Sequence, residues 1–363
     1  MRIQSIALKN FRNYKEQYVE FTEGTNILFG DNAQGKTNVL ESVYVSATTK
    51  SHKGCRDKDM IRFSQDESHI QTVVLKNDKE YQIDIHLKKN RSKGIAVNRV
   101  PIRKASALFG ILNIVFFSPE DLHIIKNGPS ERRRFLDLEL CQLDKIYFSD
   151  LVNYNKVLNQ RNKLLKDLVF RPELMDTLSV WDTQLAEYGS RIIRRRSAFV
   201  QELSEIVFAI HKKISGNREE LVVSYEPNAD AGQLETELAR LRQKDLKYCQ
   251  TSTGPHRDDL SFQISNVDIR KFGSQGQQRT SALSLKLSEI ELVKKSIHDT
   301  PVLLLDDVLS ELDSSRQNYL LNSIHDIQTI ITCTGLDEFV KNRFKIDRVF
   351  EVIDGRVELR TRK

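Results

Sequence analysis

The amino-terminal part of the chain alternates between apolar and polar positions in the manner of β-strands. Ile3, Ile6 and Leu8 lead into a turn-like segment at 10–13, and a second alternating run follows at 18–21. Further strand-like stretches lie at 69–75, 81–87, 94–97 and 113–117. A period of two places every other side chain on one face of a strand. The stretches at 69–75, 81–87 and 94–97 therefore predict an antiparallel sheet packed beside the strands of the N-terminus, and 113–117 is a further apolar strand.

Helical spacing replaces this pattern after Pro119. From 130 to about 215 the chain has few glycines and prolines, and Leu136, Leu140 and Leu143 fall on one helical face. No heptad pattern is sustained long enough for an extended coiled coil. Strand and helix patterns return after this stretch. The predicted segments are the first part of an α/β head at 1–125, an α-helical arm at 126–220 and the second part of the head at 221–363.

Composition narrows the class of protein. Of the 363 residues, 39% are hydrophobic and 29% are charged. No apolar run approaches the roughly 20 residues that a membrane span needs. The N-terminus begins a strand pattern without the apolar core of a signal peptide, so we expect a cytoplasmic protein. The four cysteines are scattered without a CxxC pair, which argues against a disulfide framework and against a zinc site.

The net charge of +6 is compatible with an acidic partner but does not require one. Basic residues are denser in the helical segment, at Arg132, Arg133 and Arg134 and again at 191–196. These arginines are candidates for contacts with nucleic-acid phosphates. Helix faces rich in arginine are, however, often only solvated, so charge alone does not establish a nucleic-acid partner.

A phosphate-binding pattern lies directly after a short apolar strand at 26–29. The pattern GxxxxGK[ST] comprises Gly30, Asp31, Asn32, Ala33, Gln34, Gly35, Lys36 and Thr37. Apolar positions recur at helical spacing from Val39, so the motif has the strand–loop–helix context that it requires. Glycines let the backbone wrap around phosphates, where N–H groups of a helix N-terminus point at the anion. We expect Lys36 to reach the β- and γ-phosphates of a nucleotide and Thr37 to bind Mg²⁺.

The second half of the predicted site lies far along the chain. Asp306 and Asp307 follow the apolar run 302–305, at the carboxyl end of a strand, where ligands of open α/β sheets bind. Asp306 suits the metal-holding role and Asp307 suits the polarisation of an attacking water. Alone, the run could be a strand that enters a solvated turn. Together with the phosphate-binding loop, it predicts that the fold brings both ends of the chain around one nucleotide.

A third candidate element is the glycine-bearing loop at 272–279, which precedes an amphipathic helix. Ser274 and the neighbouring backbone N–H groups form a second candidate anion cradle at a helix N-terminus. One nucleotide does not obviously need two such cradles. We therefore expect each molecule to offer this loop to the nucleotide of a second molecule, although the loop read alone could be an ordinary polar turn.

In this order, the three elements resemble the ATP-binding-cassette heads of SMC-type chromosome and repair ATPases. Three further segments are similar to the RecF family of bacterial recombination mediators, namely LKNFRNY at 8–14, GPSERRRFLD at 128–137 and TGPHRDDL at 253–260. The resemblance covers essentially the whole chain. It implies an α/β fold: an ABC-type (SMC-like) P-loop ATPase head of mixed sheets and helices with an inserted α-helical lid or arm subdomain.

The same resemblance implies a function. It implies an ATP-dependent, head-to-head homodimer that binds single-stranded, gapped or junction DNA and is released by hydrolysis. It also implies help in loading the RecA recombinase together with the RecR and RecO mediators, in recombinational repair, replication-fork maintenance and the SOS response. The implied cofactors are ATP and Mg²⁺, and no membrane partner is implied.

The motifs of the family carry roles onto individual residues. Ser274, Gln275 and Gly276 would face the γ-phosphate bound by the partner molecule. Arg12 and Asn13 would lie near the nucleotide.

Transporter cassettes carry a switch histidine after the strand that ends in the carboxylates. Here the segment 331–334 holds that place, so Thr332 or Thr334 would contact the γ-phosphate instead. Asp307 would act in catalysis together with Lys36. Because there is no histidine, and Asp307 stands where many cassette relatives have glutamate, we expect a weak ATPase that DNA stimulates.

Two other readings stay open. A transporter or translation-type cassette is an alternative class, although neither a membrane-docking segment nor a switch histidine is evident. A clamp that binds ATP with negligible hydrolysis is the second. His256 and Arg257 also stay open between a self-satisfied turn and a contact to DNA or nucleotide, with the structural reading slightly favoured. The sequence does not identify the DNA-contacting residues or the surface that meets the mediators.

Overall fold

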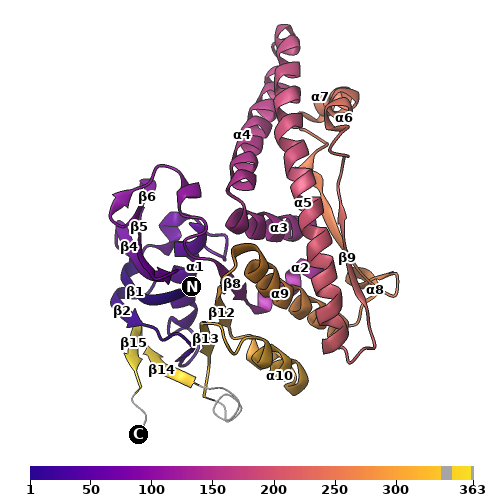
Figure 1. The fold of residues 1–363 in the computed structure, drawn as a ribbon. Coiled ribbons are helices and arrows are strands. Elements are labelled where there is room, and N and C mark those ends of the chain that lie inside the picture. Colours follow the sequence, from indigo (N-terminus) through magenta and orange to yellow (C-terminus); the bar gives the residue numbers. More distant parts are fainter. Residues whose placement is uncertain (337–345, 361–363) are drawn as a thin grey trace. The chain divides into compact units, whose positions relative to one another are not determined.

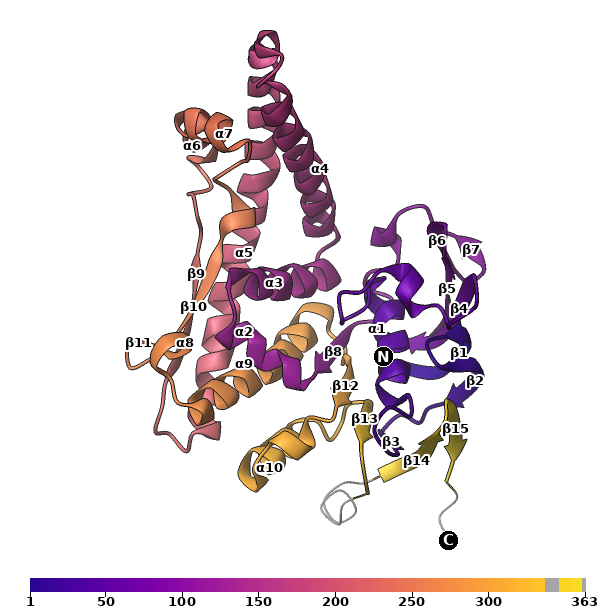
Figure 2. The same ribbon diagram turned by 180° about the vertical axis from the view of Figure 1, so that it is seen from behind.

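The computed structural model describes residues 1–336 and 346–360 (Figures 1 and 2). The chain forms two compact units. The first comprises Met1–Asp121 and Glu289–Lys363, and the second comprises Leu122–Ser288. The first unit therefore draws on both ends of the sequence. Of the segment expected at 221–363, the structure describes residues 221–336 and 346–360.

One layer of the first unit is a six-stranded antiparallel sheet with the strand order β2-β1-β4-β5-β6-β7. Its strands are β1 Arg2–Phe11, β2 Tyr14–Glu20, β4 Glu67–Lys76, β5 Lys79–Lys88, β6 Arg91–Val97 and β7 Val100–Pro101. Along β1, Ile3, Ile6 and Leu8 are at most 1% exposed. The period-two pattern thus places one face of this sheet in the core, as the sequence predicts.

The second layer is a six-stranded sheet with the order β15-β14-β3-β13-β12-β8. Its strands are β3 Thr25–Phe29, β8 Ile114–Phe117, β12 Val302–Asp306, β13 Thr329–Cys333, β14 Ile346–Ile353 and β15 Arg356–Leu359. All neighbours pair in parallel except β14 with β15. The inner strands read as continuous apolar runs because helices or a sheet cover both faces. The carboxyl ends of β3, β13 and β12 consequently meet at one edge.

Helix α1, Lys36–Thr48, contacts strands of both sheets and is almost wholly buried. Because it is buried on nearly all sides, polar Glu41, Ser42 and Ser46 are buried together with its apolar residues, and it lacks the exposed polar face of a surface helix. Helix α10, Ser314–Ser323, lies between β12 and β13 in the sequence. Short 3₁₀ turns occur at Asp57–Met60, Ala105–Ala107, Pro119–Asp121 and Leu309–Glu311.

The second unit begins with helices. They are α2 Leu122–Lys126, α3 Pro129–Leu143, α4 Lys145–Asp167 and α5 Leu178–Ile214, with a 3₁₀ turn at Pro172–Thr177 between the last two. Figure 1 shows α4 and α5 as an antiparallel pair of long helices. Leu165, Leu168 and Leu178 form a small apolar core near the turn that joins them. The expected helical arm is therefore present as a helical hairpin.

Strands and further helices complete the second unit. They are β9 Leu221–Glu226, α6 Leu234–Arg240, α7 Arg242–Tyr248, a 3₁₀ turn at Pro255–Arg257, β10 Asp259–Ile264, β11 Val267–Asp268, α8 Ile269–Phe272 and α9 Gln275–Ile297, whose end passes into the first unit. The three strands form one antiparallel sheet in the order β11-β10-β9. Residues 221–288, which the sequence places with the head, fall in this unit because β9 packs along α5.

Among the described residues, no helix is both long enough and apolar enough to cross a bilayer.

Candidate nucleotide-binding site

The loop between β3 and α1 wraps back on itself at two glycines. Gly30 has φ 151° and Gly35 has φ 116°, a region that L side chains rarely adopt. A Cβ on Gly30 would lie 2.4 Å from the backbone oxygen of Val352, and one on Gly35 would lie 2.6 Å from the Nδ2 atom of Asn13. Both positions require glycine on conformational and on steric grounds. The result is a tight loop that ends at the N-terminus of α1, the geometry that cradles phosphate.

The side chain of Lys36 folds over this loop. Its Nζ atom donates to the carbonyl oxygens of Gly30, at 2.6 Å, and Asp31, at 2.7 Å. Lys36 is only 8% exposed, so these two bonds stabilise a charge that burial would otherwise disfavour. The ammonium group is thereby held against the first two residues of the loop.

Three side chains from three elements meet at the shared edge of the parallel sheet. The Thr37 hydroxyl donates to Oδ1 of Asp306 at 2.8 Å, and the Thr332 hydroxyl donates to the same oxygen at 2.7 Å. Asp306 and Thr332 are register partners on β12 and β13. The loop at one end of the chain and the carboxylate at the other therefore belong to one site.

Asp307 follows Asp306 and leaves the strand in a left-handed conformation, with φ 53°. Its backbone N–H donates to the Thr332 hydroxyl at 3.1 Å. Burial, followed by the neighbouring charge of Asp306, raises the pKa of the Asp307 carboxyl, while Lys36 opposes this shift. A carboxylate with a raised pKa is a better proton acceptor than an ordinary aspartate.

Residues at the turn between β1 and β2 donate hydrogen bonds to the phosphate-binding loop. Asn13 donates from Nδ2 to the carbonyl of Gln34 at 2.9 Å, and Asn38 donates to its Oδ1 at 2.9 Å. The hydroxyl of Tyr14 donates to the carbonyl of Gly35 at 3.0 Å, and burial raises the pKa of this phenol. Tyr14 is a supporting residue that the sequence analysis missed. Its position directly after Asn13 was the available signal.

Arg12, expected near the nucleotide, is bound to the side of α1. Its Nε and Nη2 atoms donate to the two carboxylate oxygens of Glu41, at 2.7 and 2.6 Å, and Nη1 donates to the carbonyl of Asp59 at 2.6 Å. Burial alone would raise the pKa of Glu41, but the bonds from Arg12 and Ser51 hold it below its ordinary value. Glu41 is fully buried, and no pattern in the sequence indicates its partner.

A polar hollow of about 500 Å³ lies beside the phosphate-binding loop. It is lined by Phe29, Gly30, Asp31, Gln34, Thr334, Gly335, Leu336, Glu351, Val352, Ile353, Asp354 and Arg360. The guanidinium of Arg360 stacks over the ring of Phe29, at 5.1 Å from the centroid. Thr334 thus borders open space beside the loop, whereas Thr332 is 2% exposed and bound to Asp306.

The glycine-bearing loop before α9 lies in the second unit. Ser274 and Gln277 cap the helix reciprocally: the N–H of residue 277 donates to the Ser274 hydroxyl at 3.2 Å, and the N–H of residue 274 donates to Oε1 of Gln277 at 2.9 Å. Ser274, Gln275 and Gly276 are all exposed. The sequence-predicted cradle is therefore the accessible N-terminus of a 23-residue helix.

The chemistry of the first unit suits a phosphate-bound Mg²⁺ rather than an all-protein metal site. Among the described residues, no group of three or more His, Cys, Asp or Glu side chains could hold a metal ion. Thr37 and Asp306 do provide hydroxyl and carboxylate oxygens side by side. Mg²⁺ in nucleotide sites commonly takes one or two such protein ligands and completes its shell with water and phosphate. The residues present fit that ion.

Comparison with known proteins gives a consistent result. Residues 2–357 match the RecF/RecN/SMC N terminal domain. The chain is 68% identical over 359 residues to the DNA replication and repair protein RecF of Agathobacter rectalis, with 99% of each chain covered. It is 38% identical to a solved structure of the recombination mediator protein RecF-ATP in the RecFOR pathway, which superposes with a TM-score of 0.93 and covers 99% of this chain and 97% of that one.

A more distant structural likeness concerns the fold alone. The Smc head domain with an extended coiled coil, bound to the C-terminal domain of ScpA and derived from Pyrococcus furiosus, is 17% identical, with a TM-score of 0.57. The match covers 99% of this chain and 95% of that chain. The predicted fold class, an SMC-like ATPase head with an inserted helical segment, is confirmed.

Proposed function

This chain belongs to the RecF family of proteins with the RecF/RecN/SMC N terminal domain, and we propose that it is an ATP-dependent DNA-binding protein of recombinational repair. In this proposal ATP binding pairs two copies head to head, and the pair holds single-stranded, gapped or junction DNA. Hydrolysis of ATP then releases it. The mediators RecR and RecO act with it to load the RecA recombinase at gaps.

One observation carries the nucleotide part of this proposal. Asp306 already accepts hydrogen bonds from both Thr37 and Thr332, so the two halves of the site are held together by the protein itself. Thr37 and Asp306 are the residues that would hold Mg²⁺, and the ion would neutralise charge on the outer phosphates. Lys36 would add a second positive group at the outer phosphates. The site is thus preorganised for a triphosphate.

The residues that would surround the γ-phosphate of bound ATP are consistent with slow hydrolysis. Asp307 would accept the proton of the attacking water, for which its raised pKa is favourable. Thr332, which stands where transporter cassettes carry a histidine, uses its hydroxyl to hold Asp306. A threonine cannot replace the charge or the reach of an imidazole beside the γ-phosphate. We therefore assign a weak ATPase activity that DNA stimulates.

The loop at 274–276 supports the dimer part of the proposal. Its residues are exposed at the start of α9, and the helix N-terminus carries a partial positive charge that favours an anion. In the proposed pair, Ser274, Gln275 and Gly276 of one copy face the γ-phosphate bound by the other. ATP would then complete an interface that neither surface makes without it, so pairing follows ATP by mass action.

A transporter-type function has less support. A transporter cassette docks on a membrane domain and carries the switch histidine. Neither a docking segment nor a switch histidine is evident in this sequence. A clamp with negligible hydrolysis stays closer to the observations, because it shares the same site and differs only in turnover. The ATPase rate of the wild-type chain, measured with and without DNA, distinguishes this clamp from the proposed weak ATPase.

Sedimentation on gapped DNA tests the whole proposal. The full chain is run with ATP, with ADP and without nucleotide, each with a duplex that contains a single-stranded gap. The proposal expects a DNA-bound species of two copies with ATP alone. A single copy on DNA in all three conditions, or no DNA-bound species with ATP, contradicts it.

A further inference from the structure

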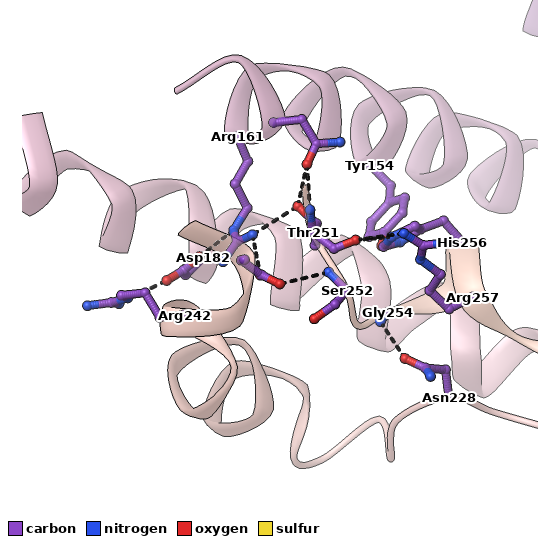
Figure 3. A network of polar contacts seen from close by, with 12 residues as sticks. Tyr154, Arg161, Asp182, Asn228, Arg242, Thr251, Ser252, Gly254, His256 and Arg257 are labelled. Carbon is purple, nitrogen blue, oxygen red and sulfur yellow. Dashed lines mark hydrogen bonds and ion pairs between the residues drawn. The ribbon is translucent and has the colours of Figure 1, made fainter. Parts of the chain in front are cut away.

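The loop at 251–257 in the second unit joins α7 to β10, and its backbone is held from several sides (Figure 3). The N–H of Thr251 donates to Oδ1 of Asn162 at 2.8 Å, and the N–H of Ser252 donates to Oδ1 of Asp245 at 2.9 Å. The N–H of Gly254 donates to Oδ1 of Asn228 at 3.1 Å, and the carbonyl of Pro255 accepts from Nη1 of Arg196 at 2.7 Å. Four side chains from outside the loop thus bind its backbone.

A buried ion network anchors the start of the loop. Arg161 on α4 is fully buried, and it donates to Asp182 on α5 at 2.6 Å, to Asp245 on α7 at 2.7 Å and to the Thr251 hydroxyl at 2.9 Å. Arg242 donates to the second oxygen of Asp182 at 2.9 Å. Two guanidinium groups thus meet two carboxylates, which makes the burial of these charges tolerable. The network cross-links three helices to the loop, and its positive and negative charges balance.

The middle of the loop is fixed as firmly. Gly254 has φ 125°, and a Cβ there would lie 2.5 Å from the Tyr154 hydroxyl. That hydroxyl lies 2.7 Å from Nδ1 of His256, whose Nε2 lies 3.1 Å from the carbonyl of Thr251. The imidazole therefore donates from Nε2 and accepts at Nδ1. Burial lowers the pKa of His256 to about 4, so at neutral pH this ring is an uncharged brace between helix and loop.

Arg257 is the exposed end of this braced loop. Its Nη2 atom donates to the carbonyl of Thr251 at 3.3 Å, and within the described part of the chain it forms no ion pair with a carboxylate. The two carboxylates that follow it in the chain are bound by other arginines: Asp258 by Arg196, which also binds Asp137, and Asp259 by Arg132.

Arg133 lies close by and donates to the carbonyl of Asp258 at 2.8 Å. The local set is four arginines, namely Arg132, Arg133, Arg196 and Arg257, and three carboxylates, namely Asp137, Asp258 and Asp259. Among the described residues, Arg132 and Arg196 bind the carboxylates, whereas Arg133 and Arg257 bind only backbone carbonyls, and of these two Arg257 is the exposed one.

We propose that Arg257 is a preorganised contact for a phosphate of the DNA backbone, with the loop at 251–257 as its rigid mount. The inference rests on the DNA-binding part of the proposed function. A guanidinium matches the oxygens of a phosphate with two parallel N–H groups. A flexible surface arginine loses conformational entropy when it binds, whereas a guanidinium on a fixed loop loses less. In this proposal the buried network holds the loop in place for DNA binding, in addition to stabilising the fold.

Salt dependence tests the contact. Fluorescence anisotropy with a labelled gapped duplex and saturating ATP is measured for the full chain and for Arg257→Gln over a series of salt concentrations. A phosphate contact contributes about 0.9 to the slope of log affinity against log salt. We expect the variant to lose about that amount per copy, hence about twice it for a pair, together with a several-fold loss of affinity near physiological salt.

Arg240→Gln is the matched control. Arg240 lies in the same unit with 64% of its side chain exposed, and Glu237 already binds it. This variant should keep the wild-type slope. Tyr154→Phe adds a test of the mount, since it removes the bond to His256 and leaves Arg257 in place; the slope should be kept while affinity falls.

Each other outcome counts against the inference. Equal slopes for Arg257→Gln and the wild type overturn it and leave the proposed function standing. Loss of ATP-dependent pairing in Arg257→Gln assigns the loop to a protein interface and also overturns it. Failure of the wild-type chain to bind DNA at all overturns both proposals. Circular dichroism of each variant confirms that the fold is kept.

Discussion

The Thr332 hydroxyl lies 2.7 Å from Oδ1 of Asp306, and the two residues stand directly opposite each other on neighbouring parallel strands. Thr37 reaches the same oxygen from the other end of the chain at 2.8 Å. The carboxylate is therefore oriented by two hydroxyl groups before any nucleotide arrives. This arrangement makes the role of each hydroxyl measurable.

Thr332→Val removes one of these hydroxyl groups at nearly constant volume. A hydrogen bond to a charged group contributes about 1.5–3 kcal/mol, so we expect a loss of about this size in the free energy of unfolding. ATP hydrolysis should fall by roughly tenfold, because a carboxylate that can rotate holds the metal less well. Chemical denaturation and a phosphate-release assay measure the two effects. Thr332→Ser keeps the hydroxyl and should retain most of both properties; equal losses in the two variants would show that the methyl group matters instead.

Asp307→Asn keeps the size of the side chain but removes its ability to accept a proton. Loss of a general base typically costs 10²–10⁴-fold in rate, so hydrolysis should fall by about 10²-fold or more. Binding of ATP should persist, since Lys36, Thr37 and Asp306 are untouched. Single-turnover hydrolysis together with ATP binding by filter assay separates the two steps. A variant that hydrolyses ATP at the wild-type rate would remove Asp307 from the mechanism.

Gly35→Ala should disable the phosphate-binding loop. The new Cβ would need φ 116° and would lie 2.6 Å from Nδ2 of Asn13 and 2.9 Å from the Tyr14 hydroxyl. Strain and clash together should cost about 3 kcal/mol and abolish ATP binding. Gly54→Ala is the control, because Gly54 also has positive φ, 68°, but nothing lies within 4 Å of its Cβ position. That variant should lose only about 1 kcal/mol and bind ATP normally, as titration calorimetry can show.

The largely buried imidazole of His256 predicts an acid-sensitive second unit. Its pKa falls from 6.5 in the unfolded chain to about 4 in the fold, so the unfolded state binds more protons between these values. The contribution of His256 to stability is therefore full above pH 6.5 and declines as the pH falls toward 4. Between pH 7 and pH 5 the loss should be about 2 kcal/mol. His256→Gln, which does not titrate, should show a correspondingly smaller change in denaturation midpoint; an identical change would mean that His256 is protonated in the fold.

Patterns that are local in the sequence led to the right elements. The strand before Gly30, the loop and the helix after Thr37 are contiguous, and an apolar run that ends in two aspartates identifies the carboxyl end of a buried strand. The rule that ligands of open α/β sheets bind at the carboxyl ends of strands then places Asp306 at the same nucleotide as the loop. Each step depends on neighbouring residues or on a general property of sheets, so one sequence is sufficient for it.

Contacts between distant segments could not be predicted in this way. Arg12 binds Glu41 because the turn after β1 lies against α1. Neither segment carries a sequence pattern that indicates the other as its partner. Residues 221–288 join the second unit because β9 packs along α5. His256 was left open because a histidine beside an arginine and two aspartates fits both a turn and a binding site until its burial is known.

The central claim is that ATP bound by one copy is completed by Ser274 of another, and the mass of the chain in solution tests it most directly. Light scattering of Asp307→Asn with ATP and Mg²⁺ should give twice the mass of the 42.0 kDa chain, and the double variant with Ser274→Arg should give a single copy. Ser179→Arg in the same background, at an exposed serine on α5, should still pair. A single copy for Asp307→Asn with ATP, or full pairing despite Ser274→Arg, would contradict the account.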